Sequence, residues 1–264
     1  MRVPKILFQT WKSKTKIPGN FAYWAATFRS ENPSYDYRLW DDADNRAFIT
    51  EHYPWFLDTY DAYPAEIYRA DAVRYFFLYH HGGIYADMDT ECLRPLDSML
   101  DVADVVLGRM GTNPNFKHSL PNALMLSAPR QEFWLLVMSL LLEPMRPIAQ
   151  RPESATGPVL LRRAHRLYTT RHTQGEVPRR IAAIRTRLPG TLAPSAQATR
   201  VAAVPGHIFF PLDWSDQIHN RLFREPMMRD GKLLDRQTIL SYFPRSLTVS
   251  YWAHSWEPPK ADTR

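Results

Sequence analysis

Residues 69–90 read RADAVRYFFLYHHGGIYADMDT, and this stretch decides the fold. A mostly apolar segment of helical length breaks at Gly82 and Gly83 and continues as a short apolar strand. Because glycine tolerates positive φ and commonly ends helices, the pattern predicts a helix, a turn and a strand. The strand delivers Asp87 and Asp89 at its carboxyl end, which is where ligands bind in open α/β sheets. The two carboxylates are therefore predicted to face a ligand.

Two aspartates separated by one residue form a hard oxygen site that suits Mg²⁺ or Mn²⁺ carrying a diphosphate. An isolated Asp-x-Asp pair is weak evidence, because solvated turns also contain it. The preceding helix strengthens the pattern, since its Asp71 and Arg74 lie among apolar residues and buried charges are costly unless paired or functional. Two interpretations stay open: Asp71 and Arg74 form an ion pair one helical turn apart, or they lie at the floor of a polar pocket beside Asp87.

Strand-like and helix-like segments alternate along the first part of the chain. The predicted strands are Ile6–Thr10, Tyr35–Trp40, Ile84–Asp87, Val105–Gly108, Ala123–Ser127, His207–Phe210 and Leu247–Trp252. The predicted helices are Phe21–Ser30, Ala43–Glu51, Ala65–His80, Gln131–Leu142, Pro158–Tyr168 and Arg236–Tyr242. This order predicts an α/β fold with a mostly parallel central sheet flanked by helices. Asp41 and Asp42 offer an N-cap for the helix that starts near Ala43.

A chain of 264 residues is long enough for one large core. We expect residues 1–264 to form a single domain with a variable helical insertion around 166–203, in the second half. Gln174–Ala203 is rich in Ala, Arg, Pro and Thr and has weak periodicity, so we interpret it as a peripheral insertion or a mobile loop.

Composition limits the class of protein. Hydrophobic residues make up 45% of the chain and aromatic residues 13%, which is typical of a globular protein. No apolar run reaches the length of a transmembrane helix, and the N-terminus lacks the apolar region of a signal peptide. The single cysteine, Cys92, suits a reducing compartment. These features predict a cytoplasmic location.

The charge of the chain favours anionic partners. The formal net charge is +6 and the pI is about 9.4. Zinc-finger spacing, an RNA-recognition signature and a continuous basic helix are all missing, so nucleic acid is not an expected partner. We expect peripheral association with the anionic inner face of a membrane that carries a lipid-linked acceptor.

Other phosphate-handling motifs fit less well. The sequence contains no Gly-rich phosphate loop, so a diphosphate must be held mainly by metal. Asp87 and Asp89 also suggest a haloacid-dehalogenase-type phosphatase. That motif requires Thr or Val where this chain has Glu91, and its downstream lysine and acidic motif are not found.

The Asp87-Met-Asp89 segment resembles the DXD region of glycosyltransferase family 32. That family includes yeast initiating mannosyltransferases, sphingolipid mannosyltransferases and bacterial polysaccharide enzymes, and the large clostridial glucosylating toxins are more distant. Further motifs follow in the family's order: Pro4–Lys12, Tyr37–Asp42, Tyr53–Leu57, Asn122–Ser127, Thr156–Pro158 and His254–Trp256. The resemblance covers residues 3–165 and returns at the C-terminus. It implies a GT-A fold and a retaining, mannosyltransferase-like enzyme that uses Mn²⁺ or Mg²⁺. Such an enzyme moves a hexose from a nucleotide-diphosphate sugar to a glycan or lipid-linked acceptor.

The resemblance also implies roles for individual residues. The implied catalytic residues are Asp71, Arg74, Asp87 and Asn122, with Asp71 and Arg74 on hydroxyls of the donor sugar. The implied donor contacts are Trp11, Asp71, Arg74, Tyr85, Asp87, Ser255 and Trp256. The implied metal ligands are Asp87, Asp89 and His254. Trp11 is equally compatible with a place in the core, Asn122 with a turn and Thr156 with a helix cap.

Several alternatives remain open. GDP-mannose and UDP-hexoses both suit as donors. The protein is either a transferase acting on glycans or lipids, an effector glycosyltransferase that modifies proteins, or a degenerate module that only binds nucleotide sugar or glycan. The intact carboxylate and arginine set disfavours the degenerate module, and the compact length disfavours the effector.

Overall fold

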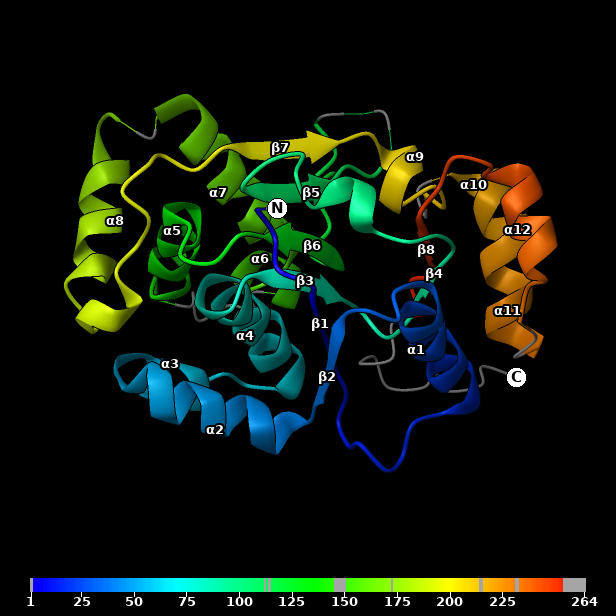
Figure 1. Cartoon of the computed structure of the whole chain (residues 1–264), viewed down its shortest axis with the longest axis horizontal. Coiled ribbons are helices and arrows are strands. Elements are labelled where there is room, and N and C mark those ends of the chain that lie inside the picture. Colours follow the sequence, from blue (N-terminus) through cyan, green and yellow to red (C-terminus); the bar gives the residue numbers. More distant parts are fainter. Residues whose placement is uncertain are drawn as a thin grey trace.

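The computed structural model describes residues 2–111, 113, 115–144, 151–171, 173–213, 216–230 and 233–253. A six-stranded sheet in the order β2-β1-β3-β6-β5-β7 lies at its centre, with helices on both sides (Figure 1). The strands are β1 Ile6–Thr10, β2 Asp36–Trp40, β3 Gly83–Ala86, β5 Val105–Gly108, β6 Leu124–Ser127 and β7 Val201–Val204. β1 pairs in parallel with β2 and β3, and β5 pairs in parallel with β7. Only β6, in this described sheet, runs antiparallel to its neighbours. The predicted mostly parallel α/β architecture is confirmed.

A second, two-stranded sheet joins β4 (Thr90–Cys92) to β8 (Thr248–Ser250) in antiparallel pairing. β4 follows directly after the Asp-x-Asp segment, so this pairing brings a segment near the C-terminus beside it. The sequence predicted the β8 region as a strand but missed β4, which is only three residues long.

The helices complete the layers. Those of the first half are α1 Gly19–Glu31, α2 Asp42–His52, α3 Leu57–Asp61, α4 Glu66–His80 and α5 Glu132–Leu141. Those of the second half are α6 Pro152–Ala155, α7 Pro158–Arg171, α8 Glu176–Arg185, α9 Gly206–Phe209, α10 Gln217–His219, α11 Glu225–Asp230 and α12 Arg236–Tyr242. The short helical turns η1 Pro54–Phe56, η2 Asp97–Met99 and η3 Gly190–Leu192 and the π-helical turn η4 Asn220–Arg224 connect them.

Strand alternation divides the core between the two faces of the sheet. One face packs against α4, α5, α7 and α8, and its strands contribute Phe8, Tyr85, Met125 and Leu107. The other face packs against α1 and α9, and its strands contribute Leu7, Ile84, Leu126 and Val106. α4 is buried over residues 71–79, which confirms that Asp71 and Arg74 lie inside the protein.

The predicted local signals at the ends of α2 and α4 are present. Asp41 caps α2 through a reciprocal pair of hydrogen bonds with Asp44. After α4, Gly82 and Gly83 adopt φ values of 67° and 96°. A Cβ on Gly83 would stand 2.5 Å from the carbonyl oxygen of Ile6, so glycine is required where β3 approaches β1.

One predicted strand was wrong. His207–Phe210 was expected as a strand, but Gly206–Phe209 forms the helical turn α9 after Pro205. A short apolar run looks the same in a buried strand and a buried helical turn. Gln174–Ala203, interpreted from the sequence as a peripheral insertion or a mobile loop, contains α8, which packs on α5, and most of the edge strand β7.

No helix in the described part of the chain has both the length and the apolar character needed to cross a bilayer.

Candidate functional site

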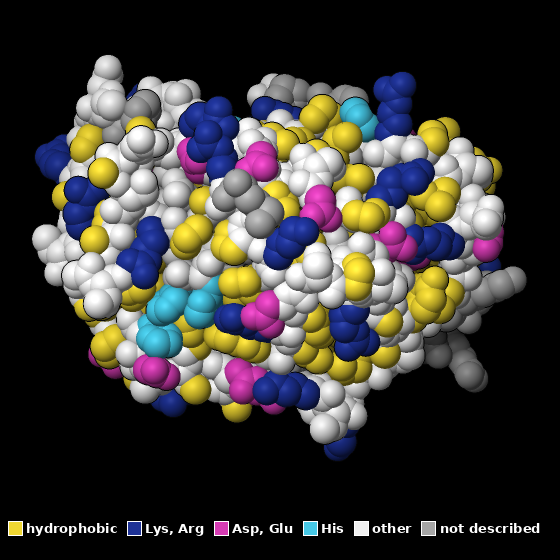
Figure 2. All heavy atoms as spheres, viewed as in Figure 1, with side chains coloured by type: hydrophobic (Ala, Val, Ile, Leu, Met, Phe, Trp, Pro, Cys, Tyr) yellow, Lys and Arg dark blue, Asp and Glu magenta, His cyan; other side chains and the backbone are white. Residues whose placement is uncertain are grey.

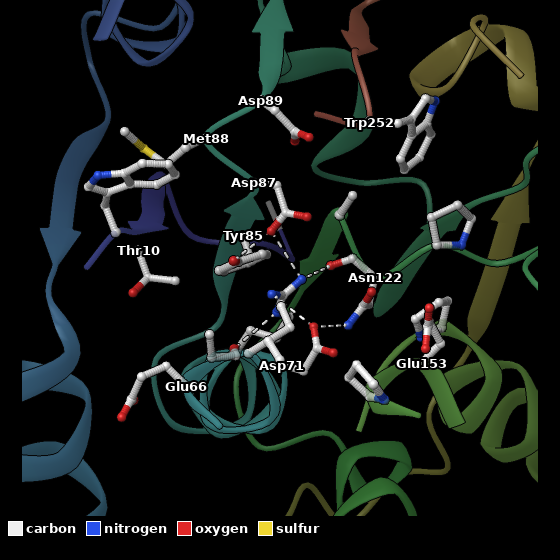
Figure 3. A pocket seen from close by; sticks show the side chains of 18 of the residues that line it. Thr10, Glu66, Asp71, Tyr85, Asp87, Met88, Asp89, Asn122, Glu153 and Trp252 are labelled. Carbon is white, nitrogen blue, oxygen red and sulfur yellow. Dashed lines mark hydrogen bonds and ion pairs between the residues drawn. The ribbon is translucent and has the colours of Figure 1, made fainter. Parts of the chain in front are cut away.

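A cavity of about 420 Å³ lies at the carboxyl ends of β1 and β3. β1 ends at Thr10 and Trp11 on one side of it, and β3 delivers Asp87 and Asp89 (Figure 3). α4 supplies the floor, while the loop before β6 and the short helix α6 supply the opposite side. The position agrees with the rule that ligands bind at the carboxyl ends of strands in α/β sheets.

Arg74 connects the floor of this cavity to the Asp-x-Asp segment. Its guanidinium lies 3.0 Å from Asp71 Oδ1 and 3.1 Å from Asp87 Oδ1, and its side chain is 4% exposed. It also donates to the Asn122 carbonyl oxygen over 2.9 Å and lies 4.4 Å from the centre of the Tyr85 ring. The ion pair and the polar pocket expected as alternatives are therefore both present.

A second group of hydrogen bonds holds Asp71. The Asn122 amide donates to Asp71 Oδ1 over 2.9 Å and to the Tyr75 hydroxyl over 3.1 Å. The Tyr75 hydroxyl in turn donates to the Thr156 carbonyl oxygen over 2.8 Å. The Thr156 hydroxyl lies 3.4 Å from Asp71 Oδ2. Asn122 is thus tied to α4 rather than free in a turn, and Asp71 is fixed from three elements.

The two aspartates of the motif are held differently. Asp87 Oδ1 accepts from the Tyr85 hydroxyl over 2.8 Å in addition to its ion pair with Arg74. Asp89 Oδ2 accepts from the backbone N–H of Ala253 over 2.8 Å, and the Asp89 carbonyl oxygen accepts from the N–H of Tyr251. Each aspartate keeps one carboxylate oxygen that takes part in no hydrogen bond we observe among the described residues.

The electrostatics of the site favour a cation. Burial raises the pKa of Asp71 to about 6, and the Arg74 guanidinium opposes that rise. Burial also raises the pKa of Asp87, and it raises that of Asp89 to about 7 with a further contribution from the Asp87 carboxylate. Three carboxylates, of which Asp71 is buried and Asp87 and Asp89 are partly exposed at the cavity, therefore lie near one guanidinium, and the excess negative charge is what a divalent cation would compensate.

The residues fit a divalent cation whose ligands are completed by a substrate. No group of three His, Cys, Asp or Glu side chains able to hold a metal occurs among the residues with described positions. Mg²⁺ is usually bound through one or two carboxylates plus substrate phosphates and water. Asp87 and Asp89 supply such a pair.

Trp11, which directly follows β1, lines the cavity. Its ring centre lies 4.5 Å from that of Phe21, and its indole N–H donates to the Lys16 carbonyl oxygen over 3.1 Å. Trp11 therefore lines the cavity with one part of its surface and packs with another. The remaining predicted residues, His254, Ser255 and Trp256, lie outside the described part of the chain.

Sequence reasoning missed three contributors. Tyr75 follows Asp71 by one helical turn, and this spacing was the available signal. Ala253 acts through its backbone, so its side chain gave no signal. Glu153 lines the cavity from α6 and had no motif around it.

Residues 18–106 match the family described as glycosyltransferase sugar-binding region containing DXD motif. This segment resembles the sugar-binding region of DXD-containing glycosyltransferases. The matched range includes Asp71, Arg74, Tyr85 and both motif aspartates, so the resemblance expected from the sequence is confirmed for the part of the chain that carries the Asp-x-Asp segment.

Several curated proteins similar to this chain are named for the transfer of mannose. Inositol phosphoceramide mannosyltransferase 2 of Schizosaccharomyces pombe is 37% identical over 152 residues, covering 53% of this chain and 43% of that protein. A mannosyl phosphorylinositol ceramide synthase of Saccharomyces cerevisiae is 41% identical over 136 residues, covering 52% and 34%. The initiation-specific alpha-1,6-mannosyltransferase of the same yeast is 35% identical over 103 residues, covering 36% and 22%. The matched stretches span less than half of each relative.

Among solved structures, the PaToxG glycosyltransferase is similar with a TM-score of 0.48 and 14% sequence identity, over 70% of this chain and 76% of that chain.

Proposed function

We propose that this protein is a metal-dependent glycosyltransferase of GT-A type that moves a hexose, foremost mannose, from a nucleoside-diphosphate sugar to an acceptor hydroxyl. The observation that carries the proposal is the buried Arg74, which joins Asp71 to Asp87 at the floor of a cavity inside the matched DXD region. The three mannosyltransferase relatives support mannose as the sugar.

A divalent cation, Mn²⁺ or Mg²⁺, held by Asp87 and Asp89 would supply Lewis-acid stabilisation of the leaving diphosphate. Tyr85 and Arg74 orient Asp87 by occupying its Oδ1. Ala253 orients Asp89 by occupying its Oδ2. Each carboxylate therefore keeps its other oxygen for the cation. His254, which follows Ala253 in the sequence, is our candidate for a further ligand.

The floor of the cavity suits recognition of the donor sugar. Among the described residues we observe one hydrogen bond to Asp71 Oδ2, the 3.4 Å contact with the Thr156 hydroxyl, so this oxygen retains capacity to accept from a sugar hydroxyl. Asn122 and Arg74 hold Asp71 through its other oxygen. Trp11, which follows β1, offers an aromatic face for the nucleotide base. Stacking of this kind contributes about 1–3 kcal/mol per base. Ser255 and Trp256 complete our set of donor contacts.

Retention of anomeric configuration is part of the proposal and rests on the family resemblance. The acceptor is proposed to be a glycan or a lipid-linked acceptor, because one relative is named an inositol phosphoceramide mannosyltransferase and another a mannosyl phosphorylinositol ceramide synthase. The net charge of +6 supports peripheral association with an anionic cytoplasmic membrane surface. We propose that residues 1–264 act as one domain.

Thermal stability in the presence of nucleotide sugars tests the proposal. A true donor stabilises the folded state by mass action, so GDP-mannose or a UDP-hexose should raise the melting temperature only when Mn²⁺ or Mg²⁺ is present. Release of free hexose or nucleoside diphosphate then distinguishes the transferase from a binding module. Stabilisation without turnover would favour the module. Transfer only to protein acceptors would favour an effector. If no nucleotide sugar raised the melting temperature in the presence of Mn²⁺ or Mg²⁺, the proposal would be contradicted.

A further inference from the structure

Glu153 lines the cavity and carries a carboxylate oxygen that has no hydrogen-bond partner among the described residues. It lies in the first turn of α6 and lines the cavity opposite the end of β1, where Figure 3 shows it across from Thr10 and Met88. Its Oε2 atom is buried and has no hydrogen-bond partner among the described residues. Buried polar atoms are rarely unsatisfied, and each exception in a native structure needs an explanation.

The position of Glu153 relative to Asp71 indicates which ligand group it meets. Asp71 Oδ2 and Glu153 Cα each lie 2.9 Å from the place a Cβ would take on Gly157. The two carboxylate-bearing residues are therefore neighbours across this glycine. Trp11 and Phe21 line the cavity too, but from the β1 side. Glu153 belongs to the sugar end of the cavity and not to its aromatic end.

The chemistry of a carboxylate determines which kind of ligand group can bind to Glu153. An ionised carboxylate only accepts hydrogen bonds, so Oε2 calls for a donor such as a hydroxyl. It would repel a phosphate, which excludes the diphosphate of the nucleotide. Asp71 already faces the proposed donor sugar, and the next hydroxyl-bearing group in a transfer reaction is the acceptor.

We propose that Glu153 is an acceptor-positioning residue whose Oε2 accepts a hydrogen bond from a hydroxyl of a sugar or polyol acceptor. This inference rests on the proposed function and identifies the acceptor side of the same cavity. His118 and Arg151 line the same cavity. A site built to hydrogen-bond a hydroxyl discriminates strongly against ligands that lack it, because its polar group is then left unpaired.

The test measures acceptor binding without turnover. The intact protein is saturated with Mn²⁺ and either GDP or UDP, and methyl α-mannoside and myo-inositol are titrated into it by calorimetry. The wild type should bind at least one of these polyols. Glu153→Ala should weaken that binding by about tenfold or more, the scale of losing a hydrogen bond to a charged group. Glu153→Gln, which keeps an acceptor oxygen, should lose less. Affinity for the nucleoside diphosphate should be unchanged in both.

The matched control is Glu51→Ala, because the Glu51 side chain is 75% exposed on α2 and should not affect polyol binding. Equal polyol affinity in Glu153→Ala and wild type would overturn the inference. A parallel loss of nucleotide affinity would also overturn it, because Glu153 would then serve the donor. Nucleotide binding without polyol binding in the wild type would overturn the acceptor assignment alone. Absence of nucleotide and metal binding would overturn the proposed function, and the acceptor assignment with it.

Discussion

Ala253 donates its backbone N–H to Asp89 Oδ2 over 2.8 Å, although the two residues are 164 positions apart in the chain. β8 leads to this contact by pairing with β4, which begins one residue after Asp89. Trp252, between β8 and Ala253, takes a positive φ of 54°, and its indole N–H donates to the Leu212 carbonyl oxygen. The C-terminal segment therefore packs against the Asp-x-Asp segment as far as residue 253.

Deletion of residues 254–264 should leave the fold intact, because β8 and Ala253 remain. It removes His254, Ser255 and Trp256, so binding of a nucleoside diphosphate with Mn²⁺ should weaken and transfer should fall. Melting temperature and calorimetric nucleotide affinity measure the two effects separately. A truncated protein with wild-type nucleotide affinity and turnover would show that these residues do not contribute ligands.

Asp89→Asn should lower turnover by at least about 10²-fold, the scale of losing one main electrostatic stabiliser. The amide still accepts from Ala253, so the melting temperature should change little, while the Mn²⁺ concentration needed for half-maximal turnover should rise. Asp58→Asn, on the exposed side of α3, is the matched control. Full turnover of the Asp89 variant, or of wild type in excess EDTA, would remove the metal mechanism.

Arg74→Ala should destabilise the fold by about 3–5 kcal/mol, because it leaves Asp71 and Asp87 buried without their counter-charge. Asp71→Asn should destabilise less, since Arg74 keeps Asp87, but it should still reduce transfer strongly. Urea unfolding and donor hydrolysis separate the two effects. Arg46→Ala is the control, because Arg46 is 54% exposed and its pair with Asp61 contributes about 0–1 kcal/mol. If Asp71→Asn were unstable yet fully active, the Asp71–Arg74 ion pair would have a structural role alone.

Gly157→Ala should disturb the sugar end of the cavity. The added Cβ would stand 2.9 Å from both Asp71 Oδ2 and Glu153 Cα, so the backbone of α6 or the Asp71 side chain must move. Overpacking of this kind lowers the free energy of unfolding by about 1–3 kcal/mol. Donor hydrolysis should fall by more than the loss of folded protein explains. Gly190→Ala is the matched control, since its Cβ would meet nothing within 4 Å. Equal activity of the two variants would contradict close packing at Gly157.

Stability should fall in mild acid because of two histidines at the end of α4. The ring centre of His80 lies 4.5 Å from that of His52 and 4.4 Å from that of His81. Figure 2 shows histidines gathered on one face of the protein. Burial lowers the pKa of His80 to about 3, helped by His81, His52 and Arg130. Burial lowers the pKa of His81 to about 4, helped by Arg38 and His52 and opposed by Asp36.

As the pH falls below about 6.5, the ordinary pKa of histidine, His80 and His81 take up protons in the unfolded chain. In the folded state they stay neutral until a lower pH. The contribution of His80 and His81 to the free energy of unfolding is complete above about pH 6.5 and is lost as the pH falls toward 4. Urea unfolding at several pH values measures this slope. His81→Asn cannot take up the proton and should reduce the slope between about pH 4 and 6.5. An unchanged slope in this variant would contradict the assignment.

The sequence by itself determined the local parts of the site. The Gly82-Gly83 break, the apolar strand and the spacing of Asp87 and Asp89 each depend on a few adjacent residues, so their structure follows from local backbone preferences. Val105–Gly108 was predicted with the bounds that β5 has. The Asp41 cap and the burial of the helix carrying Asp71 and Arg74 could also be predicted, because capping and hydrophobic patterning are local properties.

Only the tertiary structure decided how these parts are combined. The antiparallel direction of β6, the place of β7 at the sheet edge and the helical turn at Gly206–Phe209 depend on packing between distant segments. The same is true of the bond from Ala253 to Asp89 and of the unsatisfied Oε2 of Glu153. A residue's neighbours in sequence fix its backbone preference, but its burial and its hydrogen-bond partners are fixed by whichever segments fold against it.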